Sequence, residues 1–374
     1  MTIKVMKFGG SSFTDAGSYH IVARHILDRL AKDAEQVIVV VSAMQGHTEA
    51  LKSLVLSVNE TCSTDASHAV LTAGEMISVG LLEAALQRHS VPVASLFGYS
   101  VGIKTSLLFG RTLIDEVDDK PLLKALEVAR VVIVAGAQGV DGDGRVSMLG
   151  RNSSDLTAVI AADIVGSGAC EIYSDVCGIY SADPRMVREA RLLPRVSYAS
   201  ASRIARCGAK VLHHGAIEYA AGRGIAISCK SLLPNETAGT LVTSAGGGTC
   251  VVINPSATRV AFHSAVEKDR AKGVFHRLGI LWTELEQDGR NEGYLTHDAD
   301  AALFALQQED IDPLISAQRI VVLEVRERVR KVYELRDLDA AAYCARQVHA
   351  ELVDGAEAPH SRQALIGDTP LCRR

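Results

Sequence analysis

The sequence lacks the features that would direct it to a membrane, to secretion or to nucleic acid. No uninterrupted apolar run approaches the ~20 residues that a helix needs to cross a bilayer. The first residues, Met1 to Lys4, lead directly into a predicted strand and contain no apolar segment of the signal-peptide kind. The formal net charge of -5 provides no basic surface for nucleic acid. We therefore expect a cytoplasmic protein with no membrane partner and no nucleic-acid partner.

The sequence also lacks the patterns of a metal site, a disulfide framework or a nucleophilic triad. Its eight cysteines are scattered, and no two of them form a Cys-x-x-Cys pair. Isolated cysteines in a chain of this size are typically reduced and buried. No Ser-His-Asp order and no spacing of metal ligands is present. Any chemistry must therefore come from other polar groups.

Length and apolar content allow two or three domains around a sizeable core, since 48% of the 374 residues are hydrophobic. The valine run that begins at Val37 does not alternate with polar residues, which is typical of a parallel strand covered on both faces. Predicted strands alternate with helices, and this order favours an α/β layered domain. The predicted strands are 3–8, 37–42, 131–135, 172–174, 226–231 and 240–242, and the predicted helices are 74–89, 122–129 and 154–165.

A glycine-rich segment, residues 244–249, predicts the main domain boundary. Beyond it the predicted order is strand, helix, two strands, helix and strand, which is the order of a small ferredoxin-like α+β module. We predict a first domain over residues 1–243, a second over 250–353 and a disordered tail over 354–374. The predicted strands of the second domain are 251–263, 281–285, 293–295 and 320–325, and its helices are 268–278 and 299–308.

The end of the first predicted strand, Lys7-Phe8-Gly9-Gly10-Ser11-Ser12, is the most informative segment. It places one positive charge beside backbone N–H groups that no side chain shields, and a helix follows from about Gly17. This arrangement is suited to binding phosphate. The segment is not a Walker sequence, and a plain glycine turn between strand and helix is the alternative.

Two segments further along also place polar groups near strand or helix ends. Residues 42–48, Ser-Ala-Met-Gln-Gly-His-Thr, follow the second strand and suit a substrate loop or a simple connection. Glu75 lies at the start of an apolar helix, where its carboxylate can compensate the helix dipole or face an ammonium group. The residues alone favour the first role, in which Glu75 caps the helix.

The segment 150–155, Gly-Arg-Asn-Ser-Ser-Asp, follows a predicted hairpin turn at 141–145 and precedes a helix. Arg151 can hold a carboxylate through two parallel hydrogen bonds. Asp155 enters the first helical turn, where it can cap the helix or bind Mg²⁺ through water. Both residues thus suit a charged small-molecule substrate.

Two later segments complete the set. Residues 173–185 contribute an acid, two aromatic rings and an arginine, which suit a purine and phosphates. Residues 208–214 contribute Lys210, while His213 and His214 are adjacent, point apart and do not suit a metal pair. Lysines, acids, an arginine and glycine turns without a protein nucleophile favour phosphoryl transfer, because that reaction mainly requires positioning and charge neutralisation.

These segments occur in the order and at the spacing found in aspartate kinases, and the chain resembles the amino-acid-kinase domain of that family over residues 1–243. The resemblance implies a three-layer α/β fold with an eight-stranded, mostly parallel sheet, followed by an α+β module of the ACT-like, ferredoxin-like kind. It implies ATP-dependent phosphorylation of the side-chain carboxylate of L-aspartate to 4-phospho-L-aspartate. The matching blocks are 7–12, 39–48, 74–75, 102–105 with 109–110, 150–155, 174–185 and 208–213.

The resemblance also assigns roles to individual residues. Glu75 would meet the α-ammonium group of the substrate and Arg151 its α-carboxylate. ATP would bring Mg²⁺ on its phosphates, with no direct protein ligand. The implied catalytic residues are Lys7, Asp155 and Lys210; the substrate residues are Thr48, Glu75, Arg151 and Ser154; and the ATP residues are Lys7, Gly9, Gly10, Ser11, Ser42, Ser174, Asp175, Tyr180, Arg185 and Lys210.

The chain departs from the family pattern in places. Asn152-Ser153 stand where the family usually has two glycines, and Ser153 is expected to add bulk at the pocket. Glu49 and His214 also replace the usual residues. About a hundred residues follow the linker, enough for one ACT copy and a remnant, so feedback by lysine or threonine is expected to be weak or absent. The alternatives are a kinase for an aspartate analogue and a non-catalytic amino-acid-binding paralogue. A homodimer is expected.

Overall fold

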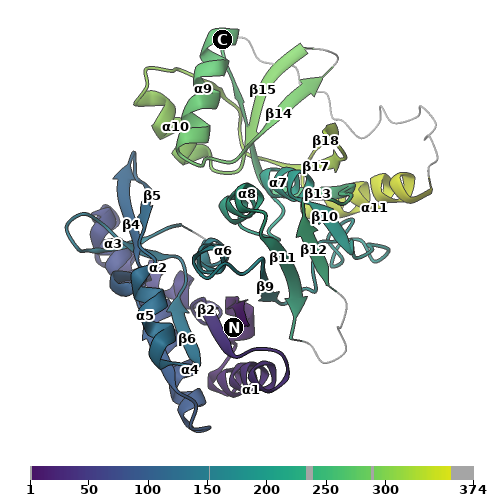
Figure 1. Cartoon of the computed structure of the whole chain (residues 1–374). Coiled ribbons are helices and arrows are strands. Elements are labelled where there is room, and N and C mark those ends of the chain that lie inside the picture. Colours follow the sequence, from purple (N-terminus) through teal and green to yellow (C-terminus); the bar gives the residue numbers. More distant parts are fainter. Residues whose placement is uncertain (1, 151, 233–238, 288–289, 355–374) are drawn as a thin grey trace. The chain divides into compact units, whose positions relative to one another are not determined.

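The computed structural model describes residues 2–150, 152–232, 239–287 and 290–354, which form two compact units (Figure 1). The first unit consists of Met1–Ile179, Pro194–Ser202 and Val211–Gly246, and the second of Tyr180–Leu193, Arg203–Lys210 and Gly247–Arg374. Two segments from within the first 243 residues therefore group with the C-terminal part of the chain. The predicted tail after Asp354 lies outside the described residues.

The first unit is built on an eight-stranded sheet (Figure 1). Its neighbouring strands pair in parallel, except β11 and β12, which confirms the mostly parallel sheet. The order across the sheet is β10 (Arg195–Ser197), β12 (Thr240–Thr243), β11 (Ala226–Ser231), β9 (Ala169–Ser174), β1 (Ile3–Phe8), β2 (Gln36–Val41), β6 (Val131–Ala135) and β3 (Val93–Leu96).

Helices pack on both faces of this sheet. Met6 and Phe8 of β1 share a core with α1 (Ala16–Lys32) and α4 (Ala73–Gln87). Lys7 points to the opposite face, toward α6 (Ser154–Ile164), because successive side chains of a strand alternate. The remaining helices of the chain up to residue 232 are α2 (His47–Val58), α3 (Thr64–Leu71), α5 (Lys120–Val128), α7 (Tyr198–Arg206), α8 (His214–Arg223) and the short 3₁₀ turns η1 (Gly10–Ser12) and η2 (Gly98–Ser100).

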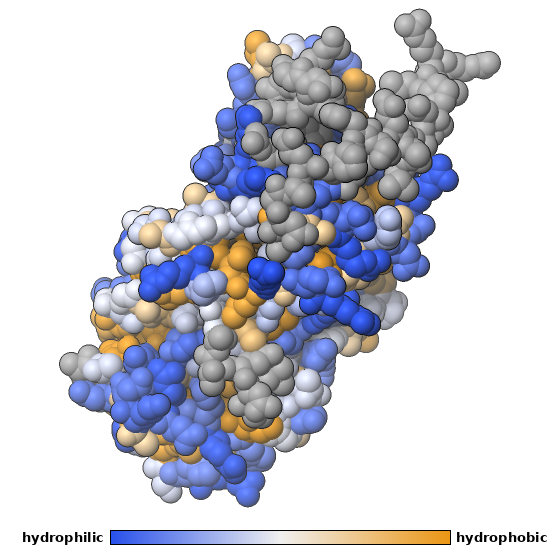
Figure 2. Space-filling model, turned by 90° about the vertical axis from the view of Figure 1, so that its right-hand side faces the viewer, coloured by the Kyte–Doolittle hydropathy of each residue, from blue (hydrophilic) through white to orange (hydrophobic). Residues whose placement is uncertain are grey.

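One long apolar helical segment of the described residues packs in the core. Residues Thr64–Gln87 are long and apolar enough to cross a membrane by length and composition. In the structure they form α3 and α4, and α4 buries Val79, Leu82 and Leu86 against the large sheet. On the face drawn in Figure 2, apolar residues form separate patches between hydrophilic ones. Packing of α4 against the large sheet therefore explains the apolar character of this segment.

A smaller sheet is added to the first unit by two hairpins. Its order is β5 (Arg111–Val117), β4 (Ile103–Leu108), β7 (Gln138–Val140) and β8 (Val146–Met148). The turn between β7 and β8 is the hairpin predicted at 141–145. Asp141 stabilises it by accepting hydrogen bonds from the backbone N–H groups of Asp143 and Arg145.

From Gly247 to Asp354 the described residues of the second unit form one connected antiparallel sheet and three helices. Six of these elements follow the predicted order of strand, helix, two strands, helix and strand, whereas β16 (Leu314–Ile315), the last strand and the last helix were not predicted. The sheet order is β14 (Trp282–Gln287), β15 (Arg290–Thr296), β13 (Cys250–Ala261), β17 (Arg319–Val325) and β18 (Val329–Leu335), with β16 (Leu314–Ile315) paired to β13; the helices are α9 (Ala265–Arg277), α10 (Ala299–Gln307) and α11 (Leu338–Asp354).

Packing explains why residues 180–193 belong to the second unit. Ala182 and Val187 are buried in a cluster with Val251 of β13 and apolar residues of β17 and α11. The backbone N–H of Val251 also donates to the carbonyl of Ser181 at 2.8 Å. Local periodicity in the sequence cannot predict that residues 180–193 pack against β13, β17 and α11.

Candidate active site

Lys7 and Asp155 form a buried ion pair on the α6 face of the large sheet. Nζ of Lys7 lies 2.7 Å from Oδ1 of Asp155, and the two side chains are 10% and 5% exposed. The second carboxylate oxygen, Oδ2, accepts a hydrogen bond from the backbone N–H of His213 at 3.0 Å. The structure thus brings together two residues predicted as catalytic that are 148 positions apart in the sequence.

The glycine pair after Lys7 lies in a closely packed turn. The backbone N–H of Gly9 donates to the carbonyl of Tyr173 at 3.0 Å. A Cβ atom on Gly10 would lie 2.9 Å from the carbonyl oxygen of Ala43, so no side chain fits there without a backbone shift. Ser11 follows in η1 and is half-buried. Close backbone approach therefore explains why glycine occupies position 10.

Ser42 and Ser154 connect the ends of β2 and α6. The Ser42 hydroxyl donates to Oγ of Ser154 at 3.0 Å, and Ser154 is buried. A Cβ atom on Gly136 would lie 2.5 Å from that same oxygen, so the end of β6 also approaches it closely. Ser154 adjoins Asp155, which places this hydroxyl pair next to the ion pair.

Glu75 is buried at the start of α4, with 4% of its surface exposed. Its Oε1 accepts a hydrogen bond from the backbone N–H of Ala43 at 3.2 Å, so it bonds to the loop after β2. Among the described residues, Oε2 has no hydrogen-bond partner. Burial raises the pKa of Glu75 to about 7, against the opposing effect of backbone N–H groups. A buried carboxylate with one open oxygen suits a cationic ligand better than a solvent-exposed cap.

The loop before α6 contains Asn152 and Ser153, where the family usually has two glycines. Arg151, predicted to hold the substrate carboxylate, lies outside the described residues. Asn152 has a φ of 61°, a conformation that asparagine tolerates better than most residues. Ser153 is fully buried, and its hydroxyl donates to the carbonyls of Leu149 and Gly150, both at 3.0 Å. The Ser153 side chain therefore bonds to the backbone of its own loop.

Two predicted substrate and nucleotide segments lie beside this centre. Thr48 is in the first turn of α2, at the end of the loop that contains Ala43, and is half-buried. Ser174 ends β9, and its hydroxyl donates to the carbonyl of Val176 at 2.9 Å. Asp175 follows it and is exposed. Ser174 and Asp175 therefore lie at the carboxyl end of β9, the strand next to β1, whose own end leads into Gly9.

His213 and His214 have separate environments, as their adjacency predicts. The His213 ring is largely buried beside Asp155, and burial lowers its pKa while the carboxylate opposes that effect. The His214 ring contacts Ser202 at 3.0 Å and Glu218 at 3.3 Å. Among the described residues no group of three or more His, Cys, Asp or Glu side chains is arranged to hold a metal ion.

Three predicted nucleotide residues belong to the second unit and are described within it. Tyr180 forms a β-bridge with Leu192, and Arg185 is exposed. Lys210 is also exposed, and the chain just before it is anchored to β13. Nδ2 of Asn254 donates to the carbonyl of Cys207 at 3.1 Å.

Of the two aromatic rings in residues 173–185, that of Tyr173 is not available to a ligand. Tyr173 is only 2% exposed, and its ring stacks on Phe8 at a centroid distance of 4.8 Å. It is therefore part of the core and has no free face for a purine. The sequence did not indicate that Ala43 bonds to Glu75, because a backbone donor leaves no signal in residue type. It also did not indicate that the buried amide of Gln138 donates to the carbonyl of Thr72 at 2.6 Å.

Comparisons with known proteins identify the family of the chain. The model of the amino acid kinase family matches residues 2–231. Aspartokinase 2 of Bacillus subtilis is 32% identical over 331 residues, which cover 87% of this chain and 79% of that protein. An aspartokinase of Mycobacterium tuberculosis is 41% identical over 232 residues, which cover 62% of this chain and 55% of that protein.

A solved structure supports the fold. Escherichia coli aspartokinase III in complex with aspartate and ADP superposes with a TM-score of 0.69 over 87% of this chain and 88% of that chain, at 22% identity. The family match covers the strands, glycine turn and buried ion pair described above. The chain therefore belongs to the amino acid kinase family and, within it, to the aspartokinases.

Proposed function

We propose that this chain transfers the terminal phosphoryl group of ATP to the side-chain carboxylate of L-aspartate, giving 4-phospho-L-aspartate and ADP. The observation that carries the proposal is the buried Lys7–Asp155 pair beside the glycine turn at the end of β1. A phosphoryl-transfer site needs fixed positive charge and close backbone approach more than it needs a nucleophile. The aspartokinase relatives and the aspartate and ADP complex of a structural neighbour support this choice of substrates.

The amino-acid subsite is proposed around Glu75. Its open oxygen would meet the α-ammonium group, and the charge of that group would favour the ionised carboxylate. Arg151 would hold the α-carboxylate, while Thr48 and Ser154 would contact the rest of the substrate. An α-amino acid with an acidic side chain has these groups in one molecule.

The reaction follows from charge. One oxygen of the substrate carboxylate attacks the γ-phosphorus, the bond to the bridging oxygen breaks, and ADP leaves with that oxygen. No general base is required, since a carboxylic acid with a pKa near 4 is ionised at neutral pH. Lys7 and Lys210 would offset the negative charge that accumulates on the transferring oxygens.

The nucleotide would bind at the strand ends that carry Gly9, Gly10, Ser11, Ser42, Ser174 and Asp175, with Tyr180, Arg185 and Lys210 as its further contacts. Mg²⁺ would enter on the phosphates of ATP and neutralise part of their charge. Asp155 would hold Lys7 through one oxygen and the backbone at His213 through the other, and the metal would be held mainly by the nucleotide.

The remaining expectations stay proposals. We infer a cytoplasmic homodimer, a boundary near residues 244–249 between a kinase domain and an ACT-like domain, and weak or absent feedback by lysine and threonine. Loss of activity in millimolar lysine plus threonine would contradict the last of these. Sedimentation at several concentrations would test the dimer.

The function is tested with purified protein, ATP, Mg²⁺ and hydroxylamine, which traps an acyl phosphate as a hydroxamate. We expect hydroxamate and ADP with L-aspartate and none with succinate, which lacks the ammonium group that Glu75 would bind. Lys7→Ala should lose about 10²–10³ in kcat, by analogy with the removal of one oxyanion-hole donor.

Lys4→Ala is the matched control, because Lys4 lies on the same strand and pairs with Asp33 outside the site. Near-normal activity of Lys7→Ala would overturn the assignment. Aspartate binding without ADP formation would favour the non-catalytic paralogue, and hydroxamate formation only from another acidic amino acid would favour the analogue kinase.

A further inference from the structure

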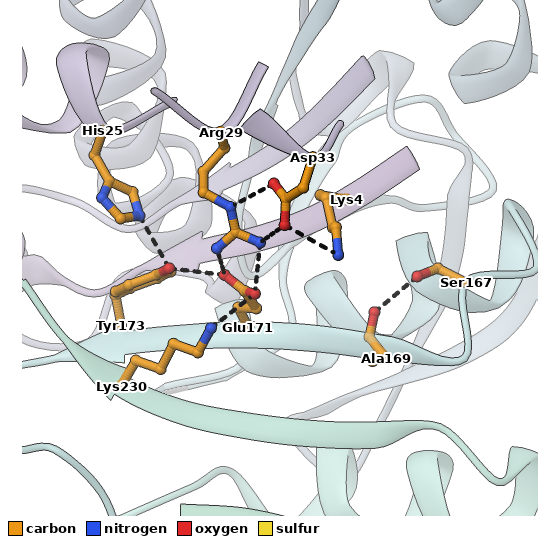
Figure 3. Close-up of polar contacts among 9 residues, drawn as sticks. All are labelled: Lys4, His25, Arg29, Asp33, Ser167, Ala169, Glu171, Tyr173 and Lys230. Atoms are coloured by element: carbon orange, nitrogen blue, oxygen red, sulfur yellow. Dashed lines mark hydrogen bonds and ion pairs between the residues drawn. The ribbon is translucent and has the colours of Figure 1, made fainter. Parts of the chain in front are cut away.

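A partly buried polar cluster lies on the α1 face of the large sheet (Figure 3). At its centre is Glu171 of β9, with 13% of its side chain exposed. The guanidinium of Arg29, on α1, donates to both carboxylate oxygens at 2.9 and 3.1 Å, and Nζ of Lys230, on β11, lies 2.8 Å from Oε1. Two cations therefore fix the orientation of one carboxylate.

The Tyr173 hydroxyl is held between this carboxylate and a histidine (Figure 3). It donates to Oε2 of Glu171 at 2.7 Å and lies 2.9 Å from Nε2 of His25. A phenol has one proton, so the hydrogen-bond network assigns the proton of the second contact to Nε2 of His25. Burial lowers the pKa of His25 and raises the pKa of Tyr173, so both are neutral at pH 7. The Tyr173 hydroxyl thus donates one hydrogen bond to Glu171 and accepts one from His25.

The other end of Tyr173 reaches the glycine turn. Its ring stacks on Phe8 with an interplanar angle of 15°, and Phe8 and Tyr173 are the last paired residues of β1 and β9. Its carbonyl accepts the Gly9 N–H at 3.0 Å. A Cβ atom on Gly9 would lie 3.4 Å from both that carbonyl and Nζ of Lys7, so these groups are close neighbours.

We propose that Tyr173 is a positioning residue for the nucleotide phosphates, through which Glu171 and His25 fix the Gly9 turn beside Lys7. This inference rests on the proposed function, because it assumes that the turn receives phosphate. A free tyrosine side chain at the end of a strand would let the last residue pair and the turn fluctuate. With the hydroxyl clamped from α1 and from Glu171, the turn is held before ligand binds, which lowers the entropy lost on binding.

Tyr173→Phe tests the inference because it keeps the ring that stacks on Phe8 and removes the clamped hydroxyl. The KM for ATP should rise about three- to tenfold, as expected for the loss of one hydrogen bond. The KM for L-aspartate should change less than about twofold, within the range of a position that makes no contact. His25→Leu should act in the same direction, whereas His25→Gln, which can still donate an N–H, should restore much of the affinity.

The matched control is Tyr219→Phe. The Tyr219 hydroxyl donates to Oδ2 of Asp163 at 2.8 Å, and Arg223 also donates to that oxygen, so the triad resembles Tyr173, Glu171 and Arg29. It joins α8 to the far end of α6, away from the glycine turn. Both Phe variants should lose similar stability in thermal unfolding, and only Tyr173→Phe should change the KM for ATP.

Calorimetric titration with MgADP separates this inference from the proposed function, since it requires no acceptor. If wild type binds MgADP but phosphorylates no amino acid, the proposed function fails while the inference is still tested by the Tyr173→Phe affinity. Equal MgADP affinity in wild type and Tyr173→Phe would overturn the inference. Equal weakening in Tyr219→Phe would also overturn it, because the effect would then be general destabilisation.

Discussion

The two units hold their candidate site residues in opposite ways. In the first unit Lys7, Glu75 and Asp155 are more than nine-tenths buried, and each side chain has a specific partner in the interior. In the second unit Arg185 and Lys210 are exposed, and Asn254 fixes the backbone near Lys210. These three charges of the first unit are therefore fixed in advance, whereas the charge of Lys210 in the second unit is exposed and its backbone is held from Asn254. An exposed lysine such as Lys210 loses side-chain entropy when a ligand immobilises it.

The largest expected effect on stability comes from breaking the buried pair. Lys7→Met leaves the Asp155 carboxylate buried without its cation, so we expect the free energy of unfolding to fall by about 3–5 kcal/mol. Lys210→Met should change it by less than about 0.5 kcal/mol, as is usual for an exposed position. Urea denaturation followed by circular dichroism measures both.

The double variant Lys7→Met with Asp155→Asn sharpens this result. It removes both charges, so it should recover most of the stability that Lys7→Met loses, while remaining inactive. If Lys7→Met and Lys210→Met were equally mild, the contrast between buried and exposed charge in the two units would be wrong.

The second effect is a pH dependence from Glu75. Folding raises its pKa from the ordinary 4.5 to about 7, so the folded state binds the proton more tightly than the unfolded state does. The stabilisation is fully present below about pH 4.5 and is lost as the pH rises through about 7. Its size is roughly 3 kcal/mol. Urea denaturation between pH 4 and 8 should show this decrease in wild type and not in Glu75→Gln.

Ser78→Ala is the control on the same helix. Ser78 is fully buried and bonds to the Tyr19 hydroxyl at 2.9 Å, but it does not titrate. Its loss should lower stability by the same amount across this pH range. A Glu75→Gln variant that kept the wild-type pH profile would show that Glu75 is ionised in the folded protein well below pH 7.

Local patterns in the sequence predicted the central strands of the first unit, but not its edge strands β3 and β10 or the helices α2, α3, α7 and α8. The strands β1, β6 and β11 have the predicted bounds. For β6 the reason is plain, because its apolar run lies between Arg130 and Gly136. Asn152 stands where the family usually has glycine, and it has a positive φ. The predictions that failed depend on contacts over long range. Nothing near Glu75 shows that Ala43 will bury its carboxylate, and nothing near Tyr173 shows that α1 will cover its ring.

The second unit was harder to predict for a related reason. Its β13 pairs with three strands: with β17 up to Ala257, across a register shift between Asn254 and Ala257, and then with β15 and β16. A single local pattern cannot show such a change of partner. The resemblance to aspartate kinases supplied the roles of Lys7, Asp155 and Lys210, but not the fact that Lys210 groups with the second unit.

The smallest of the three stability effects concerns the segment before Lys210. Gly208 has a φ of 101°, and a Cβ atom there would lie 2.5 Å from Nδ2 of Asn254. Gly208→Ala should therefore lower the stability of the second unit by roughly 2 kcal/mol, from backbone strain and overpacking together. Trp282 is the single tryptophan of the chain and lies in the second unit, so its fluorescence in urea measures this change.

A matched pair of variants separates the two causes. Gly279 also has a positive φ, at 61°, but an added Cβ atom would meet no atom within 4 Å. Gly279→Ala should show only the backbone strain, about 1 kcal/mol, in the same fluorescence assay. Adding Asn254→Ala to Gly208→Ala should relieve the overpacking and recover part of the loss. No recovery, together with equal losses for Gly208→Ala and Gly279→Ala, would mean that Asn254 does not fix the chain before Lys210, and the contrast between the two units would then rest on the first unit alone.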